Sequence, residues 1–178
     1  MHGYQIWVAM PKELEETAPS FQYISKEQLP RWTAGNMDIV LVAGSGFGKT
    51  SPLQVHSDLF MVDIKSSKAE SLEINGELQG EIAIVVTHGQ VFLEEETIEA
   101  GQMLISKTTD TCSISMSAGP RVLLFGGEPL PEERYLMWNF VSSSKERLQQ
   151  AKKEWENKAF PKVPGDDSYI PFPSPKRT

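Results

Sequence analysis

One segment of the sequence has the residue types of a phosphate-binding loop. Ala43-Gly44-Ser45-Gly46-Phe47-Gly48-Lys49-Thr50 follows an apolar stretch and ends in Gly-Lys-Thr, as do loops whose backbone N–H groups and lysine hold nucleotide phosphates. Such a loop needs a helix that begins at the lysine and directs its free N–H groups at the phosphates. Here Ser51-Pro52 and strand-like residues follow at once, and Asp63 comes too soon for a helix and a returning parallel strand. The pattern therefore favours a glycine-rich turn with residues at positive φ over a nucleotide site.

Histidine and cysteine are too few and too scattered to predict a metal site. Of His2, His56 and His88, only His56 has a metal-ligand type of residue at His-x-His or His-x3-His spacing, and that residue, Asp58, is a weak hint alone. A site assembled from distant strands stays open as an alternative. The single cysteine, Cys112, allows no disulfide within the chain and is expected to be a small buried apolar residue. We therefore predict no catalytic, cofactor-binding or metal-ligating residues in this sequence.

Length and composition describe one ordinary folded domain. The chain has 178 residues, of which 39% are hydrophobic and 23% are charged, as expected for a globular protein with a real core. The formal net charge of −7 argues against nucleic acid as a direct partner, because phosphate binding needs a basic face. No apolar run approaches the roughly 20 residues that cross a bilayer, and the first residues do not resemble a signal peptide. We expect a cytoplasmic protein without a membrane partner.

The middle of the chain is a succession of predicted strands. From Asp38 to Gly127, short alternating or β-branched stretches are separated by turn residues such as Asn75-Gly76, and no helical pattern intervenes. This pattern predicts an all-β antiparallel sandwich or barrel. The expected strands are 38–43, 59–65, 72–74, 81–87, 90–93, 103–105, 111–117 and 121–125, preceded by a short strand over residues 4–9.

A helix and a proline-rich tail are predicted after the strands. The helix covers residues 144–158, with Ser143 as its N-cap and Glu146 completing a capping box. Its apolar stripe favours packing on the protein's own surface over binding a partner. The stripe consists of Leu148, Ala151 and Trp155. Five of the 12 prolines lie between Pro161 and Pro175, so the tail is expected to be extended, with a few apolar anchors. These anchors are Tyr169, Ile170 and Phe172.

Several motifs resemble the pirin family of bicupin proteins. The start, His2-Gly3-Tyr4-Gln5-Ile6-Trp7, is similar to the family's His-Gly-x-Gln-x-Trp segment, and Gly127-Glu128-Pro129-Leu130 is similar to its Gly-Glu-Pro-Leu turn. Trp138-Asn139-Phe140 opens a segment over 138–147, and Phe160-Pro161 opens an ending, that are both similar to the bacterial pirin-like branch. The residues of these motifs for which we expect a structural role are His2, Gln5, Trp7, Gly127, Glu128, Pro129, Trp138, Asn139 and Phe140.

The resemblance implies an all-β cupin fold, a double-stranded β-helix or jelly-roll barrel, with a C-terminal α-helix and a proline-rich tail. Pirin-family members have two cupin barrels, and the N-terminal one holds a metal, usually iron, through three His and one Glu. Those ligands precede the His-Gly-x-Gln-x-Trp segment with which this sequence begins, so we expect the C-terminal half without a cofactor of its own. The expected parts are a leftover strand and linker (1–21), the barrel (22–130), and the helix with its tail (131–178).

Three hypotheses for function follow from this resemblance. The first is a metal-free pirin-like cupin module with a binding, regulatory or structural role, whose interior is more readily a filled apolar core than a ligand cavity. The second is part of a pirin-like quercetin 2,3-dioxygenase whose metal site lies outside this chain. The third is a truncated product without a function of its own. The sequence identifies no small-molecule ligand, and the strand over residues 4–8, without a sheet to join, predicts self-association.

Overall fold

The computed structural model describes residues 3–93, 96–106 and 113–173, and Cys112 therefore lies outside the described residues. The chain divides into two compact units. The larger unit is Ala18–Pro129, and the smaller one combines Met1–Thr17 with Leu130–Thr178.

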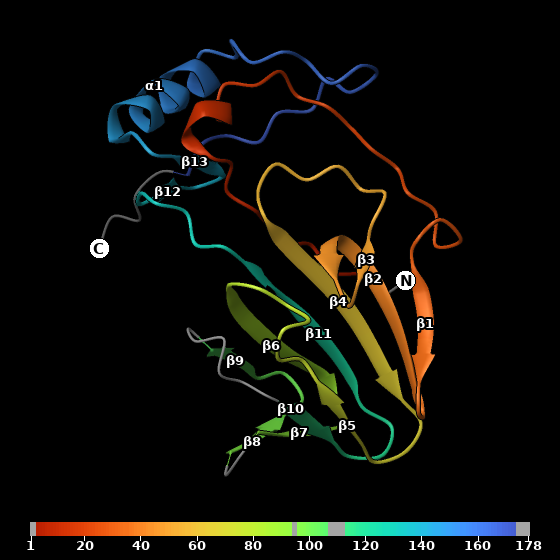
Figure 1. Cartoon of the computed structure of the whole chain (residues 1–178). Coiled ribbons are helices and arrows are strands. Elements are labelled where there is room, and N and C mark those ends of the chain that lie inside the picture. Colours follow the sequence, from red (N-terminus) through yellow and green to blue (C-terminus); the bar gives the residue numbers. More distant parts are fainter. Residues whose placement is uncertain (1–2, 94–95, 107–112, 174–178) are drawn as a thin grey trace. The chain divides into compact units, whose positions relative to one another are not determined.

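The larger unit is built from antiparallel strands. A seven-stranded sheet has the order β1-β2-β4-β11-β6-β9, with β3 paired to β2, and a four-stranded sheet has the order β5-β10-β7-β8. Figure 1 shows the central strands β2, β4, β11 and β6 side by side. The strands are β1 (Arg31–Ala34), β2 (Met37–Gly46), β3 (Lys49–Thr50), β4 (Leu59–Ser66), β5 (Glu70–Glu73), β6 (Glu81–His88), β7 (Gln90–Leu93), β8 (Glu96–Glu99), β9 (Met103–Ser106), β10 (Ser113–Met116) and β11 (Arg121–Gly127). The predicted all-β architecture is confirmed.

Alternating burial along these strands produces one apolar core between the two sheets. In β4 and β6, every second residue is buried while its neighbours are only partly covered, as the two-residue period of a strand requires. The inward residues of the large sheet and those of the small sheet belong to the same cluster. Branched side chains with no exposed surface, among them Ile39, Val62, Ile84, Val91 and Ile114, fill this space. The filled interior agrees with the first hypothesis.

The strand predictions fail where the apolar alternation is weak. β1 and β8 were not predicted, because each is a short edge strand with few apolar residues. β1 is held to β2 in part by Arg31, whose guanidinium pairs with both carboxylate oxygens of Asp38. The strand expected over residues 4–9 is wrong, since residues 3–11 have no strand assignment. A strand is defined by hydrogen bonds to a neighbour, and the apolar composition of this segment supplies none.

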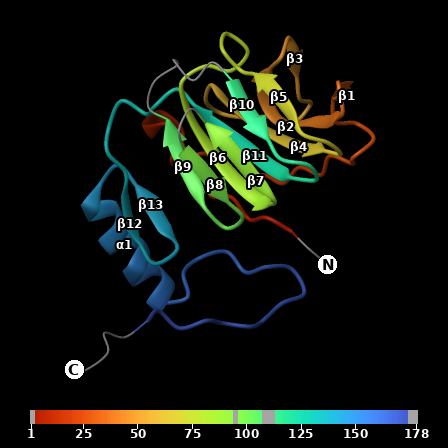
Figure 2. The ribbon, with the colours of Figure 1, turned by 90° about the horizontal axis from the view of Figure 1, so that it is seen from below.

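The smaller unit holds a two-stranded sheet and the helix. β12 (Tyr135–Met137) pairs with β13 (Phe140–Ser142), and α1 (Lys145–Glu156) packs against this hairpin (Figure 2). The buried residues of α1 are Leu148 and Ala151 of the predicted stripe. At 12 residues, α1 is much shorter than the roughly 20 residues that a bilayer crossing needs. In the described part of the chain, no helix is long and apolar enough to cross a membrane.

An aromatic cluster attaches the proline-rich tail to the helix and hairpin. Trp155 stacks on Tyr169 at 5.6 Å between ring centroids, and its indole N–H donates to the carbonyl of Ile170 at 2.8 Å. Phe172 meets Trp138 edge to face at 5.3 Å. Tyr169 and Phe172 therefore serve as the predicted anchors. Ile170 contributes its carbonyl, while its side chain stays largely exposed.

A largely buried ion pair fixes the first residues of the chain to this unit. Glu15 follows a short 3-10 helix, η1 (Lys12–Leu14), and its carboxylate lies 3.0 Å from the guanidinium of Arg134. The same carboxylate accepts hydrogen bonds from the hydroxyls of Ser142 and Ser143 at 3.0 and 3.1 Å and from the Ser143 N–H at 2.8 Å. Burial alone would raise the pKa of Glu15, but these hydrogen bonds and the charge of Arg134 together hold it below its usual value.

The predicted helix cap is displaced by one residue. Ser144, not Ser143, is the N-cap of α1, and its hydroxyl accepts from the N–H of Arg147 at 3.2 Å. Ser143 instead donates both its N–H and its hydroxyl to the carboxylate of Glu15.

Candidate functional site

The glycine-rich segment forms a tight hairpin. β2 ends at Gly46, and β3 pairs antiparallel with it, so that Gly46 faces Lys49. The two turn residues, Phe47 and Gly48, have φ angles of 53° and 64°, and a type I′ hairpin turn requires positive φ at both positions. Because a strand rather than a helix follows the turn, no helix N-terminus is available to hold phosphates. The predicted glycine-rich turn is confirmed.

Gly44 is needed where β2 passes close to β4. Its φ is 69°, and a Cβ at this position would lie 1.6 Å from the carbonyl oxygen of Leu59. The register of β2 against β4 also shifts between Leu41 and Ala43, as in a β-bulge. These two features direct the end of β2 into the hairpin beside the first residues of β4.

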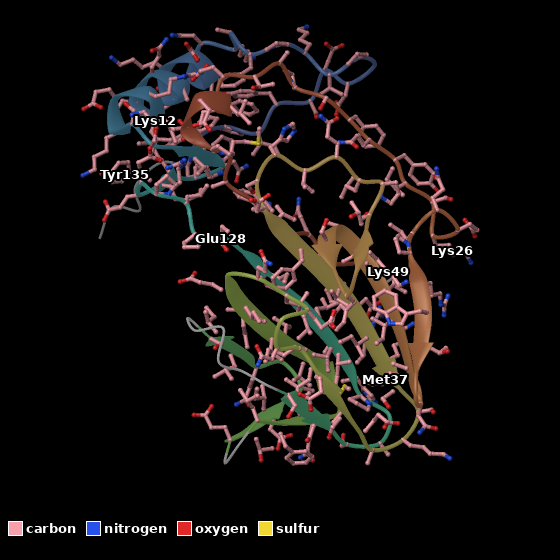
Figure 3. All side chains as sticks on the ribbon, in the orientation of Figure 1. Lys12, Lys26, Met37, Lys49, Glu128 and Tyr135 are labelled. Carbon is pink, nitrogen blue, oxygen red and sulfur yellow. The ribbon has the colours of Figure 1, made fainter. Side chains whose placement is uncertain are left out.

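A cleft of about 400 Å³ lies beside this hairpin. It is formed at one end of the seven-stranded sheet, where β2 and β11 end and β4 begins, together with the turn between β5 and β6. Figure 3 labels two of its lining residues, Lys49 in β3 and Glu128 just after β11. The lining residues are Gly44, Ser45, Gly46, Gly48, Lys49, Thr50, Val55, Ser57, Asp58, Leu59, Phe60, Glu77, Gln79 and Glu128.

Backbone hydrogen bonds tie the segments around the cleft to each other. The N–H of Glu128 donates to the carbonyl of Asp58 at 2.9 Å, and the N–H of Phe47 donates to the carbonyl of Glu77 at 3.2 Å. The segments that carry Asp58 and Glu128 are thus held to each other, and the segment that carries Glu77 is held to the hairpin. Gly127 allows the closest of these approaches, since a Cβ there would lie 2.2 Å from the carbonyl oxygen of Asp58.

The charged side chains of the cleft are mostly acidic. Asp58, Glu77 and Glu128 are exposed and have no ion pair or side-chain hydrogen bond in the described part of the chain. The ammonium of Lys49 lies 5.3 Å from the ring centre of Trp32. The hydroxyls of Ser45 and Thr50 lie 3.1 Å apart and hydrogen-bond to each other. The cleft therefore presents hydrogen-bond acceptors and net negative charge to a ligand.

The described residues do not fit the metal centre that the pirin resemblance implies. Within residues 3–93, 96–106 and 113–173, no three His, Cys, Asp or Glu side chains lie close enough to hold a metal ion. His56, on the loop that leads into β4, and His88, at the end of β6, are both exposed. His2 and Cys112 lie outside the described residues.

The motif residues fall in three places. Gln5 and Trp7 lie exposed on the extended segment near the start, with 55% of Trp7 accessible. Gly127 ends β11, and Glu128, which lines the cleft, and Pro129 follow it. The third motif makes the turn between β12 and β13: Trp138 has a φ of 51°, and Phe140 contributes to the aromatic cluster. This turn is formed by Trp138 and Asn139.

Sequence inspection did not find the cleft. Its lining comes from four stretches separated by up to about 50 positions, and no local pattern shows that these stretches meet. The segment that ends in Gly-Lys-Thr forms one wall of the cleft, but its pattern indicated phosphate binding and not this cleft. Unpaired carboxylates on predicted turns near Asp58 and Glu77 were the available signal, and turns commonly carry such residues on any soluble surface.

Comparisons with protein-family models and with curated proteins both relate this chain to pirin-like proteins. The model of the Pirin C-terminal cupin domain matches residues 61–161. A pirin-like protein of Caulobacter vibrioides is 35% identical over 176 residues, covering 97% of this chain and 60% of that protein. Pirin-1 of Arabidopsis thaliana is 23% identical over 163 residues, covering 88% of this chain and 57% of that protein.

A crystal structure of quercetin 2,3-dioxygenase from Acinetobacter baumannii superimposes with a TM-score of 0.84 at 26% identity, covering 97% of this chain and 58% of that one. This likeness and the matching domain model confirm the predicted cupin fold. The chain spans about half to three fifths of the length of the curated relatives it matches. Because the domain model covers more than half of its residues, the chain belongs to the pirin family through its C-terminal cupin domain.

Proposed function

We propose that this chain is a pirin-like cupin module that binds a small ligand at the cleft and carries no metal of its own. The observation that supports the proposal most strongly is the contrast between two spaces in the larger unit. The space between the sheets is filled by apolar side chains, whereas the cleft at the sheet end has three carboxylates, those of Asp58, Glu77 and Glu128, without partners among the described residues.

Because the interior is filled, a small ligand would bind at the end of the sheet and not between the sheets. Small barrels and sandwiches either pack their interior with side chains or keep it open for one ligand. Here side chains such as Ile39, Ile84 and Ile114, from both sheets, have no exposed surface. The cleft, by contrast, has the volume usual for small-molecule sites, and backbone hydrogen bonds hold its rim in place.

Quercetin turnover tests this proposal. The purified chain is incubated with Fe²⁺, Ni²⁺, Cu²⁺ or Mn²⁺ in turn, and oxygen-dependent loss of quercetin absorbance is recorded. A binding module without a metal site gives the same rate as the metal ion in buffer alone. A rate that rises in proportion to chain concentration would contradict the proposal.

The second candidate function is a part of a pirin-like quercetin 2,3-dioxygenase. The likeness to the Acinetobacter baumannii enzyme favours it, because the fold matches over 97% of this chain. In that case the metal site lies outside this chain, and the cupin described here supports or covers it. Turnover that appears only when a separate metal-binding cupin is added to the chain would favour this candidate.

Self-association through the start of the chain is a further part of the proposal. The segment over residues 4–8 has no strand assignment, and its apolar side chains are exposed, with 55% of Trp7 and 59% of Val8 accessible. Extended apolar segments of this kind pair readily with another chain. Sedimentation of the wild type and of Val8→Lys tests this: we expect a concentration-dependent dimer that the substitution weakens. A wild type that stays monomeric at every concentration contradicts it.

A further inference from the structure

We propose that residues 4–8 of one copy of this chain pair, as an added strand, with the outer edge of β9 in a second copy, and that the exchange is mutual. This inference rests on the proposed self-association and names the surface that receives the segment. It combines three features: an edge strand without charged residues, an apolar sheet face beside that strand, and an uncharged segment of matching length.

β9 is an uncharged edge strand of the larger unit. It ends the order of the seven-stranded sheet and, among the described strands, pairs with β6 alone (Figure 1). Edge strands are templates for pairing with another chain, and charged side chains are a common protection against it. The other strands at the ends of the two sheet orders carry such charges, namely Arg31 in β1, Glu70 and Glu73 in β5, and Glu96 and Glu99 in β8. β9 has the sequence Met-Leu-Ile-Ser and carries none.

The sheet face beside β9 that points away from the core is apolar. On β9, Met103 and Ile105 occupy this face and are 55% and 53% exposed. Their register partners on β6, and the partners of those residues on β11, are apolar as well: Val85, Ala83, Leu123 and Phe125. Antiparallel sheets commonly turn a polar face to water when the other face packs on the core. Apolar side chains on both faces therefore indicate a contact surface.

The segment over residues 4–8 matches this edge in length and in charge. Residues 3–11, which include it, contain no charged side chain and have no strand assignment. Five extended residues span about 17 Å, which covers the four residues of β9. Because side chains alternate along a strand, Ile6 and Val8 fall on one face of the added strand, where they can pack beside the exposed side chains of β9.

A second copy of this chain is the partner that these features fit. Within one copy, and among the described residues, neither the segment nor the outer edge of β9 belongs to a strand pair. Mutual exchange about a two-fold axis pairs both in each copy and leaves no open end for further growth. Each chain carries a formal net charge of −7, so copies repel each other in general, and an uncharged contact adds no like charges at the interface.

Mixing two variants in sedimentation velocity experiments tests the proposal. Val8→Glu places a charge on the donated segment, and Ile105→Lys places one on β9. We expect each variant alone to dimerise at least about tenfold more weakly than the wild type, because an apolar contact is lost at both junctions. The equimolar mixture should dimerise nearly as the wild type does. A mixed dimer has one unaltered junction and one junction that joins opposite charges.

Leu136→Lys is the matched control. Leu136 is an apolar strand residue that is 68% exposed, but it lies on β12 of the smaller unit. This variant should dimerise as the wild type does. Circular dichroism establishes that each variant is folded.

Several outcomes overturn the proposal. Unchanged dimerisation of Val8→Glu means that the segment is not donated, and unchanged dimerisation of Ile105→Lys means that β9 does not receive it. A mixture that dimerises as weakly as the separate variants means that the two surfaces do not meet. If only Ile105→Lys behaves as the wild type, the receiving surface is wrong while the proposed self-association stands. A wild type that stays monomeric at every concentration contradicts both.

Discussion

Replacing Glu15 by glutamine is expected to detach the first residues of the chain from the smaller unit. The substitution keeps the shape of the side chain but removes its charge. In the native structure, the Glu15 carboxylate faces Arg134, and the two side chains are only 13% and 9% exposed. It also accepts three hydrogen bonds from Ser142 and Ser143. The amide that replaces it offers one oxygen in place of two and leaves the guanidinium without its nearest countercharge.

The expected loss is about 3 kcal/mol for this unit. Removing one partner of a buried ion pair costs about 3–5 kcal/mol, because the other charge stays buried and unpaired. Here the lower end applies, since the guanidinium of Arg134 keeps the carboxylate of Glu132 at 3.4 Å and also donates to the carbonyls of Met10, Glu132 and Glu133. A loss of about 3 kcal/mol corresponds to an opening equilibrium more than about a hundredfold larger.

Hydrogen exchange measured by mass spectrometry locates the effect. Peptides that contain η1 and the start of α1 should exchange about a hundredfold faster in Glu15→Gln, while peptides from the β4 and β6 strands of the larger unit should be unchanged. Glu13→Gln, on the same short helix but without a partner in the described part of the chain, should change exchange very little. Equal protection in Glu15→Gln and the wild type would refute the assigned role of the ion pair.

The lowered pKa of Glu15 also predicts a pH dependence with a definite sign. Because the folded-state pKa lies below the usual value of 4.5, the ionised carboxylate stabilises the fold fully above about that pH. This contribution is lost as the pH falls through the folded-state pKa. The stability difference between the wild type and Glu15→Gln should therefore be constant near neutral pH and shrink below about pH 4.5. A difference that grows on acidification contradicts the assignment.

Three further predictions concern the hairpin and the helix. Gly44→Ala should lower stability by about 3 kcal/mol or more in thermal melts, because its Cβ meets the Leu59 carbonyl. Gly48→Ala has open space around it and should cost about 1 kcal/mol. Equal losses in the two variants would refute the close approach of β2 to β4. Ser144→Ala should cost about 1 kcal/mol in urea unfolding through the lost N-cap, and an unchanged midpoint would contradict the cap. Calorimetry with ATP and Mg²⁺ should show no saturable binding, and binding abolished by Lys49→Ala would contradict the hairpin interpretation.

The sequence predicts those strands whose apolar alternation is strong and uninterrupted. β7 was expected over residues 90–93 and is found at Gln90–Leu93, and β4 and β6 differ from their expected ranges by a single residue each. Alternation works here because one face of each strand is buried in a common core. The edge strands β1 and β8 offer few apolar residues, so their existence depends on pairing with neighbours that a local pattern does not show.

Local sequence patterns did not predict features that depend on residues far apart in the chain. Ser143 and Ser144 are equally suitable N-caps by residue type, and in the structure Ser144 caps the helix while Ser143 bonds to Glu15, more than 120 positions earlier. The cleft likewise unites turns around Asp58, Glu77 and Glu128 that share no motif. The pirin motifs indicated the family, but they lie at turns and in the aromatic cluster more than around the cleft. The motif residues therefore predicted the cupin fold correctly but did not predict where the cleft lies.

The metal content of the chain tests the central claim most directly. The 178-residue protein is expressed without a metal-affinity tag in medium supplemented with iron, nickel, copper and manganese, purified, and measured by mass spectrometry. A pirin-like cupin module that works by binding alone should contain less than about 0.1 metal ion per chain. A content near one metal ion per chain, lost on chelation together with ordered structure, would contradict the account.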